Sequence, residues 1–175
     1  MTKVELGSFT KREGWMTVDK DPRADLPWDL TNPLPFCDNT IDGFYSSHLL
    51  EHLPYPHPMK TLIISRLRCL KPGGFFSVAV PNARLYIEGY GKGEPYKIPK
   101  SDLYPQAYHY FSPIDIINYL AYLDGLHHFM FDVDNLPLIL ADAGFVDTRI
   151  RPFNPELDME ARDHESIYAI GFKRR

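Results

Sequence analysis

The segment His48-Leu49-Leu50-Glu51-His52 brings two histidines and a glutamate close together in the chain. A histidine titrates near neutral pH and can remove a proton from a hydroxyl or an amine. His48 is therefore the first candidate for a general base, and His52 is the second. An alternative stays open for His48, in which the imidazole only caps a turn or binds the backbone.

The same five residues spell H-x-x-E-H, the pattern of an inverted zinc-protease motif. That motif needs a long helix and a further ligand from a following helix, but Pro54 and Pro56 would break such a helix at once. The His-His-Phe segment at 127–129 has no matching carboxylate pattern either. We therefore expect no metal, and we expect Glu51 and His52 to hold the loop that shapes the site.

Further polar groups follow short apolar runs that read as strands. Lys3–Gly7 runs into a glycine, and Gly14–Asp19 ends in a carboxylate. The run that begins at Ile41 ends in Ser46-Ser47-His48. Because ligands bind at the carboxyl ends of the strands in open parallel sheets, His48 is the best-placed titratable group for a site at this edge.

The stretch 35–81 contains the elements that must position these groups. After the run that begins at Ile41 comes an amphipathic segment whose apolar residues fall on one helical stripe, and then a second apolar run over Phe75–Val80. Pro58 suits the first turn of the helix, and Pro72-Gly73-Gly74 stops it. The order strand, helix, strand predicts two parallel strands with a right-handed crossover. The stripe consists of Met59, Leu62, Ile63, Leu67 and Leu70.

Two phrases in this stretch, PFCDNTIDGFYSSHLLEHL at 35–53 and LKPGGFFSVAVP at 70–81, resemble the class I S-adenosylmethionine-dependent methyltransferases, in particular the small methyltransferase type 11-like group. Order and spacing carry the resemblance, which extends back to Val4 and, more weakly, to the C-terminus. It implies a single α/β domain over residues 1–175 with a Rossmann-like, mostly parallel seven-stranded sheet. The last strand of that sheet is antiparallel to the rest.

The resemblance also implies S-adenosylmethionine as cofactor and assigns residues to it. In the family, an acidic residue, one spacer and Gly-x-Gly stand at the first strand. Glu5 and Gly7 match, whereas Phe9 replaces the last glycine. A glycine there lets the backbone approach the ligand closely. Asp19 would accept hydrogen bonds from both ribose hydroxyls, because a carboxylate is an acceptor only and can serve two donors.

The remaining contacts that the resemblance implies follow the third and fourth strands. Asp29 would accept from the adenine amino group and Leu30 would pack on the ring. Ser47 and His48 would border the reacting methyl group. For Asp29 a second interpretation is equally good, namely an aspartate that caps the turn before Thr31.

Helices are expected to be reduced at the N-terminal end. Gly7 and Gly14 are too close in the chain for a loop, a helix and another loop. One face of the sheet is then thinly covered at this end. We expect either the middle insertion or a partner chain to cover it.

The middle insertion, residues 82–130, contains eight tyrosines among many glycines and prolines. Its sequence predicts loops and one helix, over roughly Pro113–Leu123. Tyrosine combines ring area with a hydroxyl, which suits a polar, ring-shaped substrate such as a sugar. A second small core under the loop explains the tyrosines equally well. His109, His127 and His128 could also face the site.

The C-terminal part is predicted to end the domain with a helix and two strands. Residues 131–145 read as a capped helix with Gly144 as its stop. Val146–Pro152 and Glu165–Lys173 read as the last two strands. The loop 154–164 between them is charged and is expected to be exposed.

Composition limits the class of protein. The length suits one domain with a hydrophobic core. No apolar run approaches the roughly 20 residues that span a bilayer, and the N-terminus lacks the apolar core of a signal peptide. Cys37 and Cys69 form no CxxC pattern, which predicts free thiols in a reducing cytoplasm. The net charge of −4 argues against a broad nucleic-acid-binding face.

Together these patterns predict an enzyme that transfers a methyl group from S-adenosylmethionine to a small-molecule or sugar hydroxyl or amine. We expect it in the cytoplasm, with a homodimer as one option. The alternative is a non-catalytic module that kept the fold, lost the cofactor site and acts through a partner subunit on the bare sheet face. Phe9 and the missing helices are the reasons for that alternative.

Overall fold

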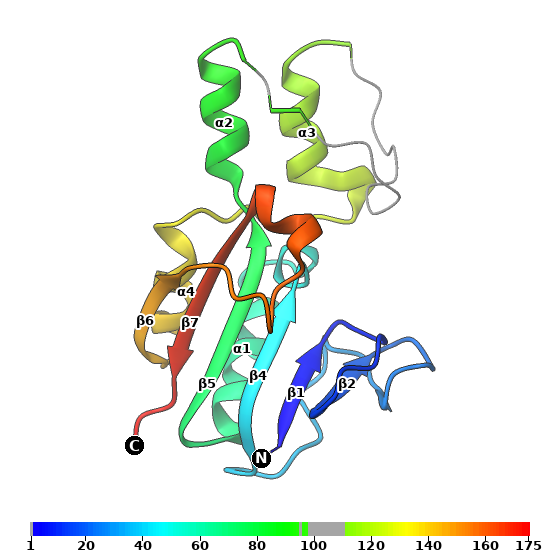
Figure 1. Ribbon diagram of the computed structural model, residues 1–175, viewed down its shortest axis with the longest axis vertical. Coiled ribbons are helices and arrows are strands. Elements are labelled where there is room, and N and C mark those ends of the chain that lie inside the picture. The colour runs from blue at the N-terminus through cyan, green and yellow to red at the C-terminus, as the bar shows by residue number, and fades with distance from the viewer. Residues whose placement is uncertain (1, 95, 98–110) are drawn as a thin grey trace.

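The computed structural model describes residues 2–94, 96–97 and 111–175. A seven-stranded sheet forms its centre (Figure 1), with the strand order β3-β2-β1-β4-β5-β7-β6. Strand β7 runs antiparallel to its neighbours β5 and β6, and every other pair is parallel. The predicted fold is therefore confirmed. The strands are β1 (Lys3–Leu6), β2 (Trp15–Asp19), β3 (Leu26–Pro27), β4 (Ile41–Ser47), β5 (Leu70–Pro81), β6 (Val146–Arg151) and β7 (Ser166–Phe172).

The predicted βαβ unit consists of β4, helix α1 (Met59–Cys69) and β5. The helix ends before the Pro-Gly-Gly turn, which lies within the extended segment assigned to β5. Gly74 is needed there, because an added Cβ would lie 2.9 Å from the carbonyl oxygen of Lys71. The turn therefore shapes the start of β5 and does not stop the helix as predicted.

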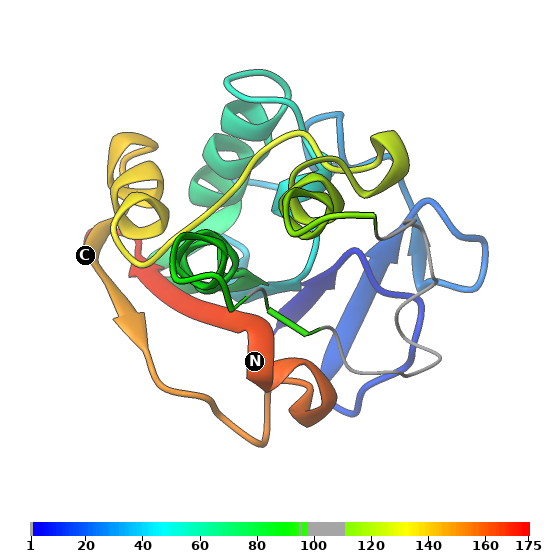
Figure 2. The same ribbon diagram turned by 90° about the horizontal axis from the view of Figure 1, so that it is seen from above.

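Alternation along the strands gives the sheet two different faces. Apolar side chains such as Val4, Phe44 and Val78 belong to the main hydrophobic core. Helices α1 and α4 (Asn135–Asp142) lie on this side of the sheet (Figure 2) and contribute Leu62 and Leu136 to the same core. This face has the helical cover that is usual for a mostly parallel sheet.

The opposite face is polar and is covered by the segment 152–165, which crosses the sheet in Figure 1. Asp158 lies at its centre and accepts a hydrogen bond from the Tyr45 hydroxyl at 3.1 Å. The Arg151 guanidinium binds both carboxylate oxygens of Asp158, at 2.5 and 2.7 Å, and also donates to Ser77 Oγ. Because charged groups need such partners when they are buried, this network replaces an apolar helix interface.

The cover on this face corrects two expectations. The segment 152–165 lies over the sheet, whereas the middle insertion or a partner chain was expected to do so. The loop 154–164 is also not uniformly exposed, since Asp158 is buried. Arg12, in the connection between β1 and β2, donates to the Leu157 carbonyl oxygen at 2.9 Å and pairs with Glu5. That connection contains no helix, as predicted.

The middle insertion contains two described helices, α2 (Ala83–Gly91) and α3 (Ile114–Tyr122), where one was predicted. Both stand above the carboxyl edge of the sheet (Figure 1). The prediction of loops was wrong for α2, whose start is capped by the Asn82 side chain. Tyr86 and Ile116 join the two helices in a small core of their own, as the second interpretation of the tyrosines proposed. Tyr104, Tyr108, Tyr110 and His109 lie outside the described residues.

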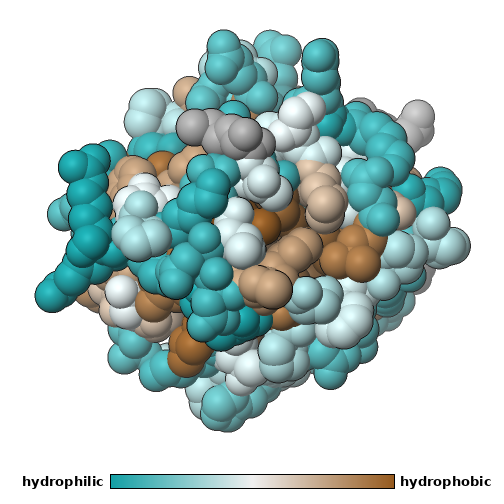
Figure 3. Space-filling model, turned by 90° about the horizontal axis from the view of Figure 1, so that it is seen from below, coloured by the Kyte–Doolittle hydropathy of each residue, from teal (hydrophilic) through white to brown (hydrophobic). Residues whose placement is uncertain are grey.

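The opposite end of the molecule, where the parallel strands begin, carries both chain termini (Figure 1). Seen from this end, a small hydrophobic area is surrounded by hydrophilic side chains (Figure 3). Both cysteines are free thiols; Cys37 is exposed and Cys69 is buried. Within the described part of the chain, no helix has the length and hydrophobicity required to cross a bilayer.

Candidate functional site

A pocket of about 420 Å³ opens at the carboxyl edge of the sheet, where β1, β2, β3 and β4 end. Seven of the residues that the sequence nominated line it together. Segments beyond the strands complete the pocket, including the loop after a short helical turn, η2 (Leu123–Gly125). The seven are Gly7, Asp19, Asp29, Leu30, His48, His52 and His128, and the others are Lys20, Thr31, Leu49, Leu53, Gly125 and Leu126.

Gly7 ends β1 with a left-handed backbone, at a φ of +76°. Its amide donates to the Val18 carbonyl oxygen at 2.8 Å, which holds the turn against β2. An added Cβ would lie 3.0 Å from the Leu49 side chain on the pocket wall. A glycine therefore serves both the backbone conformation and the shape of the pocket.

Asp19 and Asp29 each use one carboxylate oxygen to hold a turn. Asp19 Oδ1 accepts from the Asp21 amide at 2.8 Å. Asp29 Oδ1 accepts from the amide and the hydroxyl of Thr31, at 2.9 and 2.8 Å, and these bonds lower the pKa of Asp29. Asp29 is thus a turn-capping residue and also lines the pocket, so its two interpretations are compatible. Among the described residues, no other hydrogen bond occupies either carboxylate.

His48 follows β4 with a left-handed backbone, at a φ of 49°. Its Nε2 lies 2.8 Å from Ser166 Oγ, and that hydroxyl donates its hydrogen to the Arg162 carbonyl oxygen. Nε2 must therefore donate to Ser166, which leaves Nδ1 with a free lone pair. Nδ1 lies 3.7 Å from Glu51 Oε1.

The surroundings of His48 keep it neutral. Burial lowers its pKa well below the ordinary value, and the nearby Arg162 charge adds to this effect. Its described side-chain partner is a hydroxyl group, not the backbone. A left-handed conformation at a non-glycine residue is often found at functional sites.

A second, smaller cavity of about 110 Å³ adjoins the first, and His48 and His52 line both. It lies under α2 and α3 and includes the short helical turn η1 (Leu50–His52). Tyr86 donates to Glu165 Oε2 at 2.5 Å within it. Burial raises the pKa of Glu51 to about 8. Its lining consists of His48, Glu51, His52, Pro81, Tyr86, Tyr119, Leu120, Leu123, His127, Arg162 and Glu165.

Three nominated positions lie outside both cavities. Glu5 faces the polar side of the sheet, where it pairs with Arg12 at 3.1 Å, and burial raises its pKa. Ser47 does not line either cavity. Phe9 is partly exposed and stacks with Arg23, whose guanidinium carbon lies 3.8 Å from the ring centroid. Phe9 therefore does not occupy the larger pocket.

Sequence reasoning named His127 and His128 as residues that could face the site, and they line the smaller and the larger cavity, respectively. It missed Leu126, Arg162 and Glu165, which other segments also bring there. Leu126 enters the pocket wall because the His52 Nδ1 donates to its carbonyl oxygen at 3.0 Å. The His128 amide donates to the Glu51 carbonyl oxygen at 2.7 Å and fixes the same segment. Arg162 and Glu165 come from the charged stretch before β7. The neighbouring histidines His127 and His128 were the only signal in the sequence for the segment 125–128, which forms the roof of the larger pocket.

Comparisons with known proteins agree with this arrangement. The family model for a methyltransferase domain matches residues 19–78. A search of curated protein sequences finds no match.

Solved structures with a similar fold include a S-adenosylmethionine-dependent methyltransferase from Archaeoglobus fulgidus, with a TM-score of 0.62 and 16% identity over 98% of this chain and 86% of that one. Phosphoethanolamine N-methyltransferase 2 from Haemonchus contortus, in complex with S-adenosyl-L-methionine, matches with a TM-score of 0.61 and 12% identity. The match covers 99% of this chain and 49% of that one. A chain in the complex between the Haloferax volcanii Trm112 methyltransferase activator and a methyltransferase matches with a TM-score of 0.56 and 15% identity. The match covers 99% of this chain and 83% of that one.

The chain thus has the fold of a class I methyltransferase. The family match adds sequence similarity within that class, so the resemblance to S-adenosylmethionine-dependent methyltransferases is confirmed. At these identities the solved structures establish the fold alone. The family match over residues 19–78 supports methyl transfer as the general class of activity.

The larger pocket has the donors and acceptors that suit S-adenosylmethionine. Its volume falls within the range of about 300–1,000 Å³ that is common for small-molecule sites. Asp19 supplies a carboxylate acceptor, Leu30 an apolar wall, and Gly7 a close approach of the backbone. The residues present are therefore compatible with this cofactor.

Proposed function

We propose that this chain transfers a methyl group from S-adenosylmethionine to a small-molecule or sugar acceptor through a hydroxyl or an amine. The observation that carries this proposal is the shared pocket of Gly7, Asp19, Asp29 and His48. These residues come from the ends of separate strands, and the family resemblance assigns each of them to the cofactor or the methyl group.

In this proposal the acids orient the cofactor. Asp19 would accept from the ribose hydroxyls, and Asp29 would accept from the adenine amino group through Oδ2, since Thr31 occupies Oδ1. Leu30 would pack on the adenine ring. S-adenosylmethionine supplies an activated methyl group, so the chain mainly aligns the acceptor and removes its proton.

His48 is the residue that we propose as the base. Its Nδ1 has a free lone pair because Nε2 donates to Ser166. A neutral imidazole can take a proton from an acceptor hydroxyl or amine at that atom. Its place on the border of the two cavities would put the acceptor in the smaller one and the cofactor in the larger one.

The smaller cavity favours a small polar part of the acceptor. Arg162 and Glu165 supply one charge of each sign, and Tyr86 and Tyr119 supply rings. Such a mixture of rings and polar groups is suited to a sugar or another polar ring. The acceptor proposal thus uses two of the tyrosines that the sequence singled out.

The alternative, a module that has lost the cofactor site, receives less support. Phe9 was its main reason, and Phe9 stacks on Arg23 outside the pocket. The bare sheet face was its second reason, and the network around Asp158 covers part of that face. Both observations favour the enzyme.

Calorimetric titration with S-adenosylmethionine tests the proposal. We expect micromolar binding by the natural chain and a loss of roughly 100-fold in Asp19→Ala, because two hydrogen bonds to a charged group disappear. Asp21→Ala is a matched control, since its backbone amide still holds Asp19. Absence of binding by the natural chain at millimolar cofactor would contradict the proposal. Mass spectrometry of the purified protein for a retained adenosyl ligand gives a second readout.

A further inference from the structure

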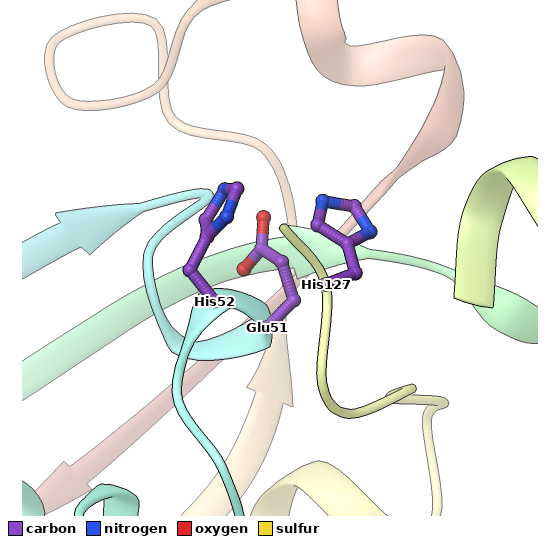
Figure 4. A group of neighbouring side chains, drawn as sticks. All are labelled: Glu51, His52 and His127. Atoms are coloured by element: carbon purple, nitrogen blue, oxygen red, sulfur yellow. The ribbon is translucent and has the colours of Figure 1, made fainter. Parts of the chain in front are cut away.

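We propose that Glu51, His52 and His127 form a binding site for one divalent transition-metal ion. The group combines two imidazoles with one carboxylate, and one ligand atom from each lies within 4.8 Å of the others. Figure 4 shows the Glu51 carboxylate between the two rings, with His127 approaching from a separate segment. This proposal departs from the sequence-based expectation that the chain binds no metal.

The two histidines are held in the tautomer that binds a metal. His52 Nδ1 lies 3.0 Å from the Leu126 carbonyl oxygen, and His127 Nδ1 lies 2.7 Å from the Leu120 carbonyl oxygen. Because a carbonyl oxygen only accepts, each Nδ1 must carry the hydrogen. Each Nε2 then has a free lone pair, and a backbone carbonyl is a common partner of metal-binding histidines.

Glu51 lacks the partners that a buried carboxyl group requires. Its side chain is 2% exposed, and neither oxygen has a hydrogen-bond partner among the described residues. An unpartnered buried polar group costs about 1–3 kcal/mol, and an ionised one costs more. No hydrogen bond within the described structure satisfies this carboxylate, and a bound cation would do so.

Backbone contacts place the three side chains together. Glu51 and His52 belong to η1, and the Glu51 carbonyl oxygen accepts from the His128 amide at 2.7 Å. The imidazoles of His52 and His127 meet at 4.8 Å between centroids, almost at right angles. Ligands at about 2.1 Å from zinc are roughly 3.4 Å apart in a tetrahedron, so the three groups need to close by little more than 1 Å.

The charges around the cavity allow one more cation. When a bound cation displaces the proton of Glu51, Glu51 and Glu165 contribute −2 and Arg162 contributes +1, so these lining groups sum to −1 with neutral histidines. Tyr86 binds Glu165 and keeps that carboxylate away from the group of three. The positive charge of Arg162 weakens cation binding at the group of three, and the negative charge of Glu165 offsets this effect.

The ligand set selects the class of metal. Two imidazoles and one carboxylate suit zinc, cobalt or iron in the divalent state, whereas magnesium and calcium prefer oxygen ligands. Three protein ligands leave a fourth position open. The group of three lines the smaller cavity, which also holds His48. A metal at this position would therefore adjoin the proposed acceptor, although the metal site itself does not depend on methyl transfer.

Titration of the chelator-treated full chain with Co²⁺ tests this proposal, with visible absorption and elemental analysis as readouts. We expect one ion per chain, intense bands of a tetrahedral site, and displacement of Co²⁺ by Zn²⁺. Glu51→Gln and His127→Gln should each weaken binding by at least the 10–100-fold that is typical for second-shell partners. His57→Gln is the matched control, because His57 is exposed and its side chain binds Thr61 and no other described residue.

Three outcomes would overturn the metal site. The first is absence of cobalt bands in the natural chain, which requires no variant to fold. The second is unchanged affinity in both ligand variants, and the third is an equal loss in His57→Gln. Circular dichroism shows whether each variant is folded. Because cofactor binding is measured separately through Asp19, failure of one proposal is distinguishable from failure of the other.

Discussion

The two cavities at the carboxyl edge are built in different ways. The larger one forms where β1 to β4 end, so neighbouring strands bring Gly7, Asp19 and Asp29 together. The smaller one forms between η1, the helical cap of α2 and α3, and the stretch before β7. Only the first follows a general rule of parallel sheets. The difference shows that a pocket at strand ends can be inferred from the sequence, whereas a cavity between distant segments depends on contacts that the sequence does not record.

The largest effect should come from His48, which lines both cavities. His48→Gln should lower turnover by about 10²–10⁴-fold, the range for loss of a general base, and change cofactor affinity little. Formation of S-adenosylhomocysteine with a panel of sugars and small polar acceptors measures turnover. His57→Gln is the control. A loss of cofactor binding equal to the loss of turnover would make His48 a residue of the larger pocket alone.

Gly7→Ala should affect the larger cavity and leave the smaller one intact. An alanine in the left-handed backbone conformation of Gly7 lowers the free energy of unfolding by about 1–2 kcal/mol, and its Cβ would press on the Leu49 side chain. We expect a lower free energy of unfolding and weaker cofactor binding. Gly91→Ala is the control, since it lies in α2 with nothing near its Cβ position, and it should be neutral or stabilising. Equal thermal and calorimetric results for the two variants would refute the role of Gly7.

Tyr86→Phe should act on the smaller cavity alone. The change leaves the buried Glu165 carboxylate without this donor, which costs about 1–3 kcal/mol. Thermal unfolding should show a decrease of several degrees in Tm, with cofactor affinity unchanged. Tyr90→Phe, in the same helix but exposed, should have no such effect. Weaker cofactor binding in Tyr86→Phe would mean that the cavities are not separate.

Leu126→Ala should have the smallest effect, because this side chain of the pocket roof is 59% exposed. We expect a few-fold loss of cofactor affinity and a stability change within about 0.5 kcal/mol. Leu138→Ala, on α4, is at 68% somewhat more exposed and lines neither cavity, so it should change neither quantity. Titration calorimetry measures both variants. A large loss in Leu126→Ala would show that the roof is a principal part of the pocket.

The sequence predicts the sheet and the larger pocket because both follow local patterns. Alternating apolar residues indicate the strands, and polar residues at their ends indicate the edge where Asp19 and His48 meet. The helix α2 was missed because Gly89 and Gly91 are poor helix formers, and a cap at Asn82 outweighs them. Gly89 has its own packing reason, since an added Cβ would lie 2.7 Å from the Glu94 carbonyl oxygen.

The smaller cavity was not predictable for a different physical reason. His127 reaches Glu51 only after the insertion folds back, and no periodicity in the sequence records that contact. Asp158 was likewise expected to be exposed, because a charged loop usually is, yet Arg151 and Tyr45 bury it. Both errors concern polar groups whose burial depends on partners that are far away in the chain.

The chain leaves the sheet for the helical cap and returns from it at neighbouring positions. Asn82 and Phe131 form a parallel bridge, and the Ala83 amide donates to the Phe131 carbonyl oxygen at 2.8 Å. The chain therefore leaves the sheet and returns to it through adjacent residues, whatever lies between them. Helices of another length or composition could be exchanged at this junction without altering the register of β5 and β7. Under the proposed function, we expect such an exchange to change the acceptor preference while the strand ends beneath stay unchanged.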